Sequence, residues 1–64
     1  MELTSREREV LALLGEGLGA RRIADRFDVS IATVRNHIHA ILGNLGCHSQ
    51  LEAVATARRR GLLS

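Results

Sequence analysis

Apolar side chains recur at the spacing of one helix face in four separate stretches of the chain. The longest stretch covers residues 31–45, and on a wheel that turns about 100° per residue its inward side chains all fall within about 40° of Val34. These side chains are Val34, Ile38, Ile41 and Leu45. In the other three stretches the side chains expected to face inward are Val10, Leu11 and Leu14, then Ile23, Ala24 and Phe27, and finally Ala53, Val54 and Ala57. The pattern predicts an all-α fold of four short helices.

Capping residues mark where these helices begin and end. Two pairs have the three-residue spacing of a capping box, Thr4 with Glu7 and Ser49 with Glu52. Ser30 stands where it can cap the third helix, which is expected to span about residues 31–45. Glycines follow the first, third and last helices, at Gly15 and Gly17, at Gly46 and at Gly61.

The second and third helices are separated by only three residues, Asp28, Val29 and Ser30. Two helices across so tight a connection form a helix-turn-helix, whose second helix enters the major groove of DNA. A chain of 64 residues allows only one domain, so residues 1–64 are expected to form a single domain. We expect a tetrahelical bundle without a wing, with the helix-turn-helix at its centre.

Composition narrows the range of functions. A 64-residue domain buries only about 60% of its unfolded surface, so a deep substrate cavity is not expected. The 45% of hydrophobic residues include a single aromatic, Phe27, which suits aliphatic helices better than a β-sandwich. Nine arginines against seven acids give a formal charge of +2, a mild excess that suits a polyanionic partner.

Cysteine usage and hydropathy favour the cytoplasm. Cys47 is the only cysteine, so the fold does not use the internal disulfides of small secreted domains. No apolar run approaches the roughly 20 residues of a membrane span, and Met1 to Arg8 lack the apolar core of a signal peptide. We expect a soluble protein without membrane contact.

The polar face of the third helix carries the candidate chemistry. Its side chains lie between about 100° and 200° from Val34 on the wheel and form one contiguous face. They are Ala32, Arg35, Asn36, His39 and Gly43. Arginine pairs bidentately with guanine and asparagine with adenine, while small side chains let a helix approach the base edges. We predict base contacts from Arg35, Asn36, His39 and Ala32, the alternative being an ordinary solvated helix face.

Two other groups of residues invite a metal or catalytic interpretation. His37 and His39 point about 200° away from each other on a helix, so they cannot share one ion. Cys47, His48 and Ser49 lie on a turn without a third orienting group or a pocket. We therefore expect no metal, no cofactor and no enzymatic activity.

Short sequence motifs that occur together in one known class of protein are spread along nearly the whole chain. They begin with Leu3-Thr4-Ser5-Arg6-Glu7-Arg8-Glu9-Val10-Leu11 and Ile23-Ala24. They continue with Thr33-Val34-Arg35-Asn36-His37, Ile41 and Leu45-Gly46, and end with Glu52-Ala53-Val54, Ala57 and Gly61-Leu62-Leu63. Over Leu3–Leu63 the chain thus resembles the LuxR/GerE-type DNA-binding domain of bacterial transcription regulators.

This resemblance implies a four-helix domain that binds double-stranded operator DNA as a homodimer. Such domains are often the C-terminal part of a larger response regulator, attached to a receiver or ligand-sensing domain. Arg35 and Asn36 would face bases, and His39 stands where the family often has lysine. Thr33 and Arg21 would contact phosphates near the starts of the third and second helices. Arg22 and Asn44, which replace a common glutamate and a common lysine, complete the candidate phosphate contacts.

The last helix has a second face besides its core face. Leu51, Ala55 and Arg58 lie about 100° from the core residues on the wheel. In the resembling family the outward face is the dimer contact, which makes these three residues the candidates. The alternative for Leu51 is an ordinary exposed leucine.

Two other functions compete with operator binding. One is a helical interaction module that dimerises or docks a partner without reading DNA, as the weak net charge suggests. The other is the promoter-binding region of a sigma factor, which has a similar helix-turn-helix but gives no reason for the Leu51 face.

Overall fold

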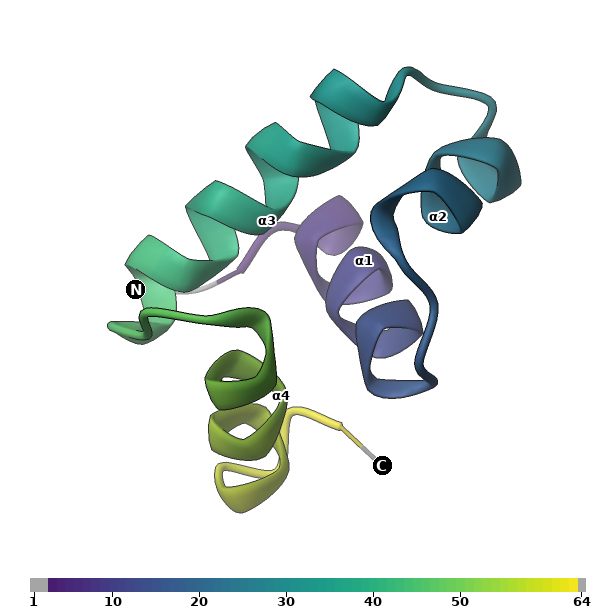
Figure 1. Ribbon diagram of the computed structural model, residues 1–64. Coiled ribbons are helices and arrows are strands. Elements are labelled where there is room, and N and C mark those ends of the chain that lie inside the picture. The colour runs from purple at the N-terminus through teal and green to yellow at the C-terminus, as the bar shows by residue number, and fades with distance from the viewer. Residues whose placement is uncertain (1–2, 64) are drawn as a thin grey trace.

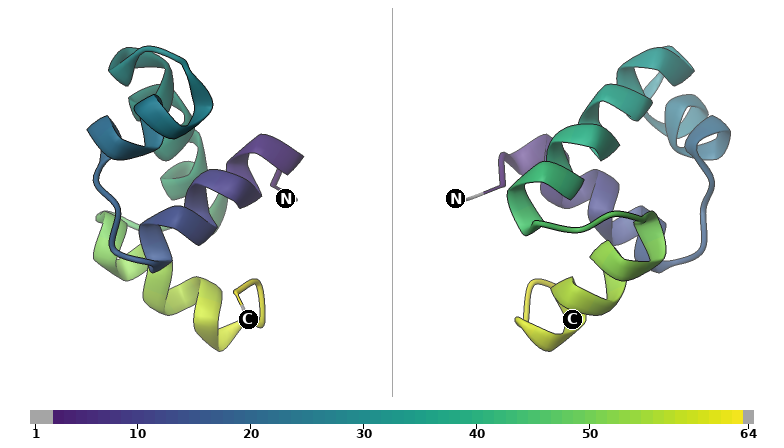
Figure 2. Two further views of the ribbon diagram at one scale, coloured as in Figure 1. Left: turned by 90° about the vertical axis from the view of Figure 1, so that its right-hand side faces the viewer. Right: turned by 60° about the vertical axis from the view of Figure 1, so that its left-hand side comes forward.

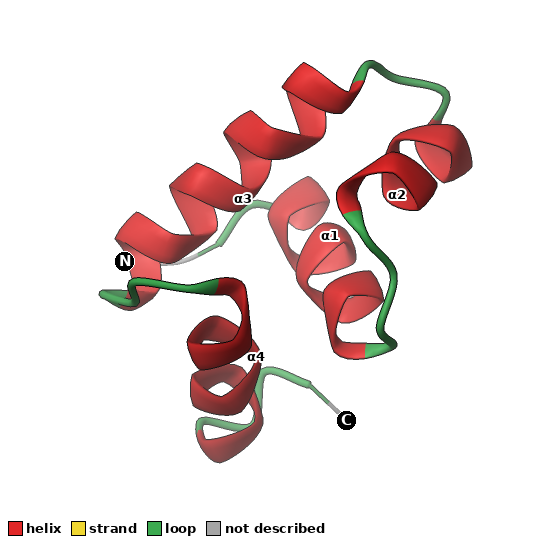
Figure 3. Cartoon of the chain, viewed as in Figure 1, coloured by secondary structure: helices red, strands yellow, loops and turns green. Residues whose placement is uncertain are grey.

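The computed structural model describes residues 3–63, and within this part of the chain the backbone forms four α-helices and no β-strand (Figure 1). The helices are α1 (Ser5–Gly15), α2 (Ala20–Phe27), α3 (Ile31–Leu45) and α4 (Gln50–Arg59). Short loops join them (Figure 3). The predicted all-α fold and the predicted extent of the third helix are confirmed.

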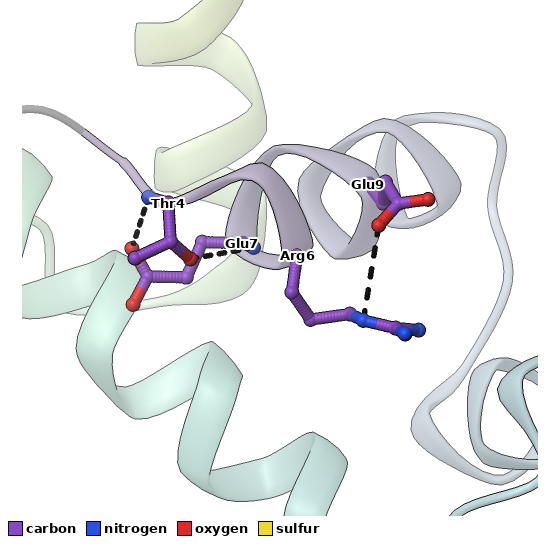
Figure 4. A network of polar contacts seen from close by, with 4 residues as sticks. All are labelled: Thr4, Arg6, Glu7 and Glu9. Carbon is purple, nitrogen blue, oxygen red and sulfur yellow. Dashed lines mark hydrogen bonds and ion pairs between the residues drawn. The ribbon is translucent and has the colours of Figure 1, made fainter.

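A complete capping box starts α1. The backbone N–H of Glu7 donates to Thr4 Oγ1 at 3.1 Å, and the Thr4 N–H donates to Glu7 Oε1 at 3.0 Å (Figure 4). Two backbone donors that the first turn of a helix leaves free are thereby satisfied. The prediction for this helix start is confirmed.

The start of α4 differs from the prediction. The Glu52 N–H donates to Ser49 Oγ at 3.1 Å, as expected, but Glu52 Oε1 accepts from the N–H of His48 at 2.6 Å and not from Ser49. The backbone of Ser49 is more extended than that of Thr4, with φ of −147° against −70°, so the two cap residues differ in backbone conformation as well as in hydrogen bonding. The second half of the predicted box is therefore wrong, and the glutamate holds the preceding residue.

The hydrophobic core lies between α3 and the other three helices, and each of those three helices packs against α3. The predicted inward stripe of α3 is confirmed, since all four of its side chains are buried: Val34, Ile38, Ile41 and Leu45. Leu14 and Phe27 are only half-buried. The Phe27 ring is covered by the guanidinium of Arg6, whose Cζ lies 4.2 Å from the ring centre, a cation–π arrangement.

Residues 28–30 make the turn between α2 and α3. Asp28 adopts a left-handed conformation with φ of 56°, and the N–H of Val29 donates to the Ala24 carbonyl oxygen at 3.0 Å. This Schellman-like ending closes α2 and lets α3 begin at once, with Ser30 as its cap. The helix-turn-helix is confirmed, and α3 runs along the outside of the molecule (Figures 1 and 2).

Candidate nucleic-acid interface

The outer face of α3 is exposed along the whole helix. Each predicted base-contacting side chain lies on it and is exposed: Ala32, Arg35, Asn36 and His39. Gly43 continues the same face, as does Ala40, which the sequence analysis did not include. No acidic residue lies in the sequence of α3, so nothing on this helix repels phosphate. A free helix face of this kind can lie in the major groove of B-form DNA.

The polar side chains of this face are not used inside the domain. Within residues 3–63, Arg35, Asn36 and His39 form neither a side-chain hydrogen bond nor an ion pair. Their donors and acceptors are therefore available to a ligand. Arg35 and Asn36 are the two side chains that can read guanine and adenine bidentately.

Two hydroxyl groups lie together at the first turn of α3. Ser30 Oγ accepts from the Thr33 N–H at 3.1 Å, and it lies 2.9 Å from Thr33 Oγ1. One hydroxyl hydrogen is used between the two oxygens, which leaves the other free to donate outward. Either Ser30 or Thr33 can carry this free hydrogen, and a hydroxyl at the positive end of a helix dipole suits an anionic oxygen.

The first turn of α2 presents two exposed arginines, Arg21 and Arg22. Its cap residue, Gly19, provides no side-chain hydrogen bond, and the turn contains no acid. Asp25 follows Arg22 by three residues and forms no ion pair with it within 4.0 Å. Both guanidinium groups are thus free to contact a phosphate backbone.

Asn44 lies differently from the other candidates. Its Nδ2 donates to Glu7 Oε1 at 3.3 Å, a bond that joins the end of α3 to the first turn of α1. The wheel does separate Asn44 from the other candidates, because Asn44 lies about 80° from Val34 on the side opposite Arg35, but it does not identify Glu7 as the partner. The structure therefore places Asn44 at the edge of the core, apart from the Arg35 face.

The three dimer candidates lie on α4 and are exposed: Leu51, Ala55 and Arg58. Leu51 has 82% of its surface exposed and borders a shallow hollow that includes Leu18 and Val54. Arg58 donates from Nη2 to the Gly15 carbonyl oxygen at 3.0 Å, a contact within the chain that the sequence analysis missed. All three residues lie on α4, whereas the predicted base-contacting residues lie on α3.

No metal-binding cluster is found among the described residues, where no three His, Cys, Asp or Glu side chains come together. Cys47 is half-buried, with its Sγ 3.4 Å from Thr56 Oγ1. None of the helices in residues 3–63 has the length and apolar content that crossing a membrane requires.

Comparison with known proteins agrees with this geometry. Residues 1–57 match the family described as bacterial regulatory proteins, luxR family. The transcriptional regulatory protein DesR of Bacillus subtilis is 37% identical over 59 residues, which cover 92% of this chain and 30% of DesR.

Two solved structures are similar over 97% of this chain. The response regulator ChrA of a heme-sensing two-component system has a TM-score of 0.92 at 35% identity, with 31% of its chain covered. The transcription factor GerE has a TM-score of 0.89 at 37% identity, with 92% of its chain covered. The chain thus spans less than a third of DesR and ChrA and nearly all of the GerE chain.

Proposed function

The chain belongs to the luxR family of bacterial regulatory proteins, and from this membership we propose that α3 enters the major groove of operator DNA. DNA binding in transcription regulation is the function that the family and its regulator relatives support. Membership favours this function over an interaction module that does not read DNA and over a sigma-factor region.

Base reading is assigned to the exposed face of α3. Arg35 pairs with a guanine and Asn36 with an adenine, while Ala32 lets the helix approach and His39 adds a donor one turn further on. The observation that carries this proposal is that the polar side chains of this face are exposed and have no partner within the described domain.

Phosphate contacts are assigned to side chains that flank this face. Thr33 contributes its hydroxyl group, and Arg21 and Arg22 contribute charge from the start of α2. The second amide hydrogen of Asn44, which the bond to Glu7 leaves unused, completes the set. Such contacts fix the position of the protein on DNA and carry no sequence information directly.

Homodimerisation on DNA is assigned to the outer face of α4. Leu51 is a large, almost fully exposed apolar side chain, and Ala55 lies one turn later on the same face. Arg58 lies at the end of this face, where its charge borders the contact. A two-fold axis near Leu51 would bury the same patch of both subunits.

The whole protein is proposed to be a larger, cytoplasmic regulator without catalytic activity in this domain. Residues 1–64 form its single DNA-binding domain, and a receiver or ligand-sensing domain is covalently attached. The coverage of DesR and ChrA supports this arrangement, since both have about 70% of their length outside the similar region. The domain needs no cofactor to bind DNA.

Selection from a random duplex library, followed by fluorescence anisotropy against salt, tests the proposal. We expect a preferred operator and an affinity that falls steeply with salt, because each neutralised phosphate adds about 0.9 to the logarithmic slope. Binding to no duplex at low salt would contradict the proposal and favour the interaction-module alternative.

A further inference from the structure

The carboxylate of Glu7 connects α1 to α3. Its Oε1 accepts from the Thr4 N–H at 3.0 Å and from Asn44 Nδ2 at 3.3 Å. Glu7 is buried, with 8% of its surface exposed, and Asn44 is half-buried. Within residues 3–63 this is the one hydrogen bond between side chains of α1 and α3. The helix-capping glutamate of α1 therefore also holds the end of the proposed recognition helix.

This contact differs in kind from the rest of the packing between the two helices. The buried side chains of α1 and α3 are otherwise aliphatic, and aliphatic contacts have no preferred direction. A hydrogen bond is restricted in both distance and angle. The bond from Asn44 to Glu7 thus adds a directional restraint on the rotation of α3 about its own axis to the restraint that core packing provides.

Rotation of α3 decides where Arg35 points. On the helical wheel Asn44 lies about 80° from Val34 in one direction, and Arg35 lies about 100° from it in the other. The two side chains are therefore on opposite sides of the buried stripe. Any rotation of the helix that draws Asn44 away from Glu7 turns Arg35 through the same angle.

We propose that Asn44 is a positioning residue for base reading: its hydrogen bond to Glu7 fixes the rotation of α3 and thereby aims Arg35 at its base pair. The inference rests on the proposed function of α3. It assigns Asn44 a role in specificity that does not require contact between this side chain and DNA. Bidentate pairing needs a narrow geometry, so a small rotation costs discrimination before it costs overall affinity.

The test compares Asn44→Leu with Asn44→Lys. Leucine has a similar size and no donor, whereas lysine restores a donor to the Glu7 carboxylate. The readout is the ratio of affinities for the selected operator and for its variant at the base pair that Arg35 reads. This ratio cancels the sequence-independent attraction that the added lysine charge brings.

We expect Asn44→Leu to lower this ratio about three- to tenfold, the range that one ordinary hydrogen bond supplies. Asn44→Lys should restore most of the ratio. Cys47→Ala is the matched control, because it removes a half-buried contact to Thr56 just beyond α3 and leaves the Glu7 bond intact. Circular dichroism checks the fold, and Asn44→Ala, which also removes the donor, replaces the leucine variant if the latter does not fold.

Either of two results would overturn the positioning role. One is an Asn44→Leu protein that discriminates as well as the unaltered chain. The other is an equal loss of affinity on operator and variant duplexes, which would leave Asn44 with its phosphate contact alone and no part in discrimination. Both results differ from an absence of DNA binding by the unaltered chain, which would instead contradict the proposed function.

Discussion

The guanidinium of Arg58 donates a hydrogen bond from Nη2 to the carbonyl oxygen of Gly15 at 3.0 Å and so joins α4 to the end of α1. α1 has no basic residue in its own last turn. A cation at the carboxyl end of a helix is favourable because it faces the negative end of the helix dipole. Arg58 thus supplies from another helix the charge that α1 lacks.

Replacing Arg58 with methionine should lower the free energy of unfolding by about 0.5–1.5 kcal/mol, since it removes one exposed hydrogen bond while keeping the apolar stem. Arg60→Met is the control, because Arg60 is exposed and has no side-chain hydrogen bond within residues 3–63. Urea denaturation followed by circular dichroism measures both. Equal stability of the two variants would show that the Gly15 contact contributes nothing.

Gly43→Ala should raise the free energy of unfolding by about 0.5–1 kcal/mol, because alanine costs less conformational entropy inside a helix. An added Cβ at Gly43 meets no atom within 4 Å. Gly46 has equally open surroundings but a φ of +68°, so Gly46→Ala should lower the same free energy by about 1 kcal/mol. Urea denaturation should therefore give shifts of opposite sign, and shifts of the same sign would contradict this account of α3 and its end.

Much of the fold follows from local sequence signals. The α3 stripe, the Thr4 cap and the left-handed stop at Gly46 each depend on residues close together in the chain, and each is confirmed. At the start of α4 only the bond from the Glu52 N–H to Ser49 Oγ was predicted correctly. The spacing of Ser49 and Glu52 does not specify the backbone conformation of Ser49, and the Glu52 carboxylate accepts from the N–H of His48 instead.

The predicted α3 face is exposed as expected, whereas contacts between distant residues escaped the sequence analysis. Asn44 and Glu7 are 37 residues apart, and Arg58 and Gly15 are 43 apart. Helical periodicity assigns each of these side chains to a face of its own helix. It does not say which carbonyl or carboxylate of another helix that face meets, because the meeting depends on how the helices cross.

Leu51→Asp should weaken dimerisation on operator DNA and lower operator affinity while leaving the helical content unchanged. Dimerisation should weaken because a carboxylate buried in an apolar interface loses its hydration. The fold should remain because Leu51, with 82% of its surface exposed, takes no part in the core. Sedimentation with and without operator DNA measures the association, and circular dichroism measures the fold. Leu62→Asp, the same change at another exposed leucine, is the control.

Unchanged assembly of the Leu51→Asp protein on the operator would remove α4 from the proposed interface. Leu62 has 36% of its surface exposed, so circular dichroism must first show that the Leu62→Asp protein is folded. Loss of assembly by the folded Leu62→Asp protein as well would show that the added negative charge, and not the α4 face, is responsible.

In the proposed complex, α3 reads bases through Arg35, while Arg21 only holds the phosphate backbone. The most direct measurement is the affinity of Arg35→Ala and Arg21→Ala for the selected operator and for each of its single-base variants. Arg35→Ala should lower the binding free energy for the operator by about 1–3 kcal/mol, and it should abolish the preference for one base at a single base pair. Arg21→Ala should weaken binding to every duplex about equally. An Arg35→Ala protein that discriminates at every base pair as well as the unaltered chain would contradict the account.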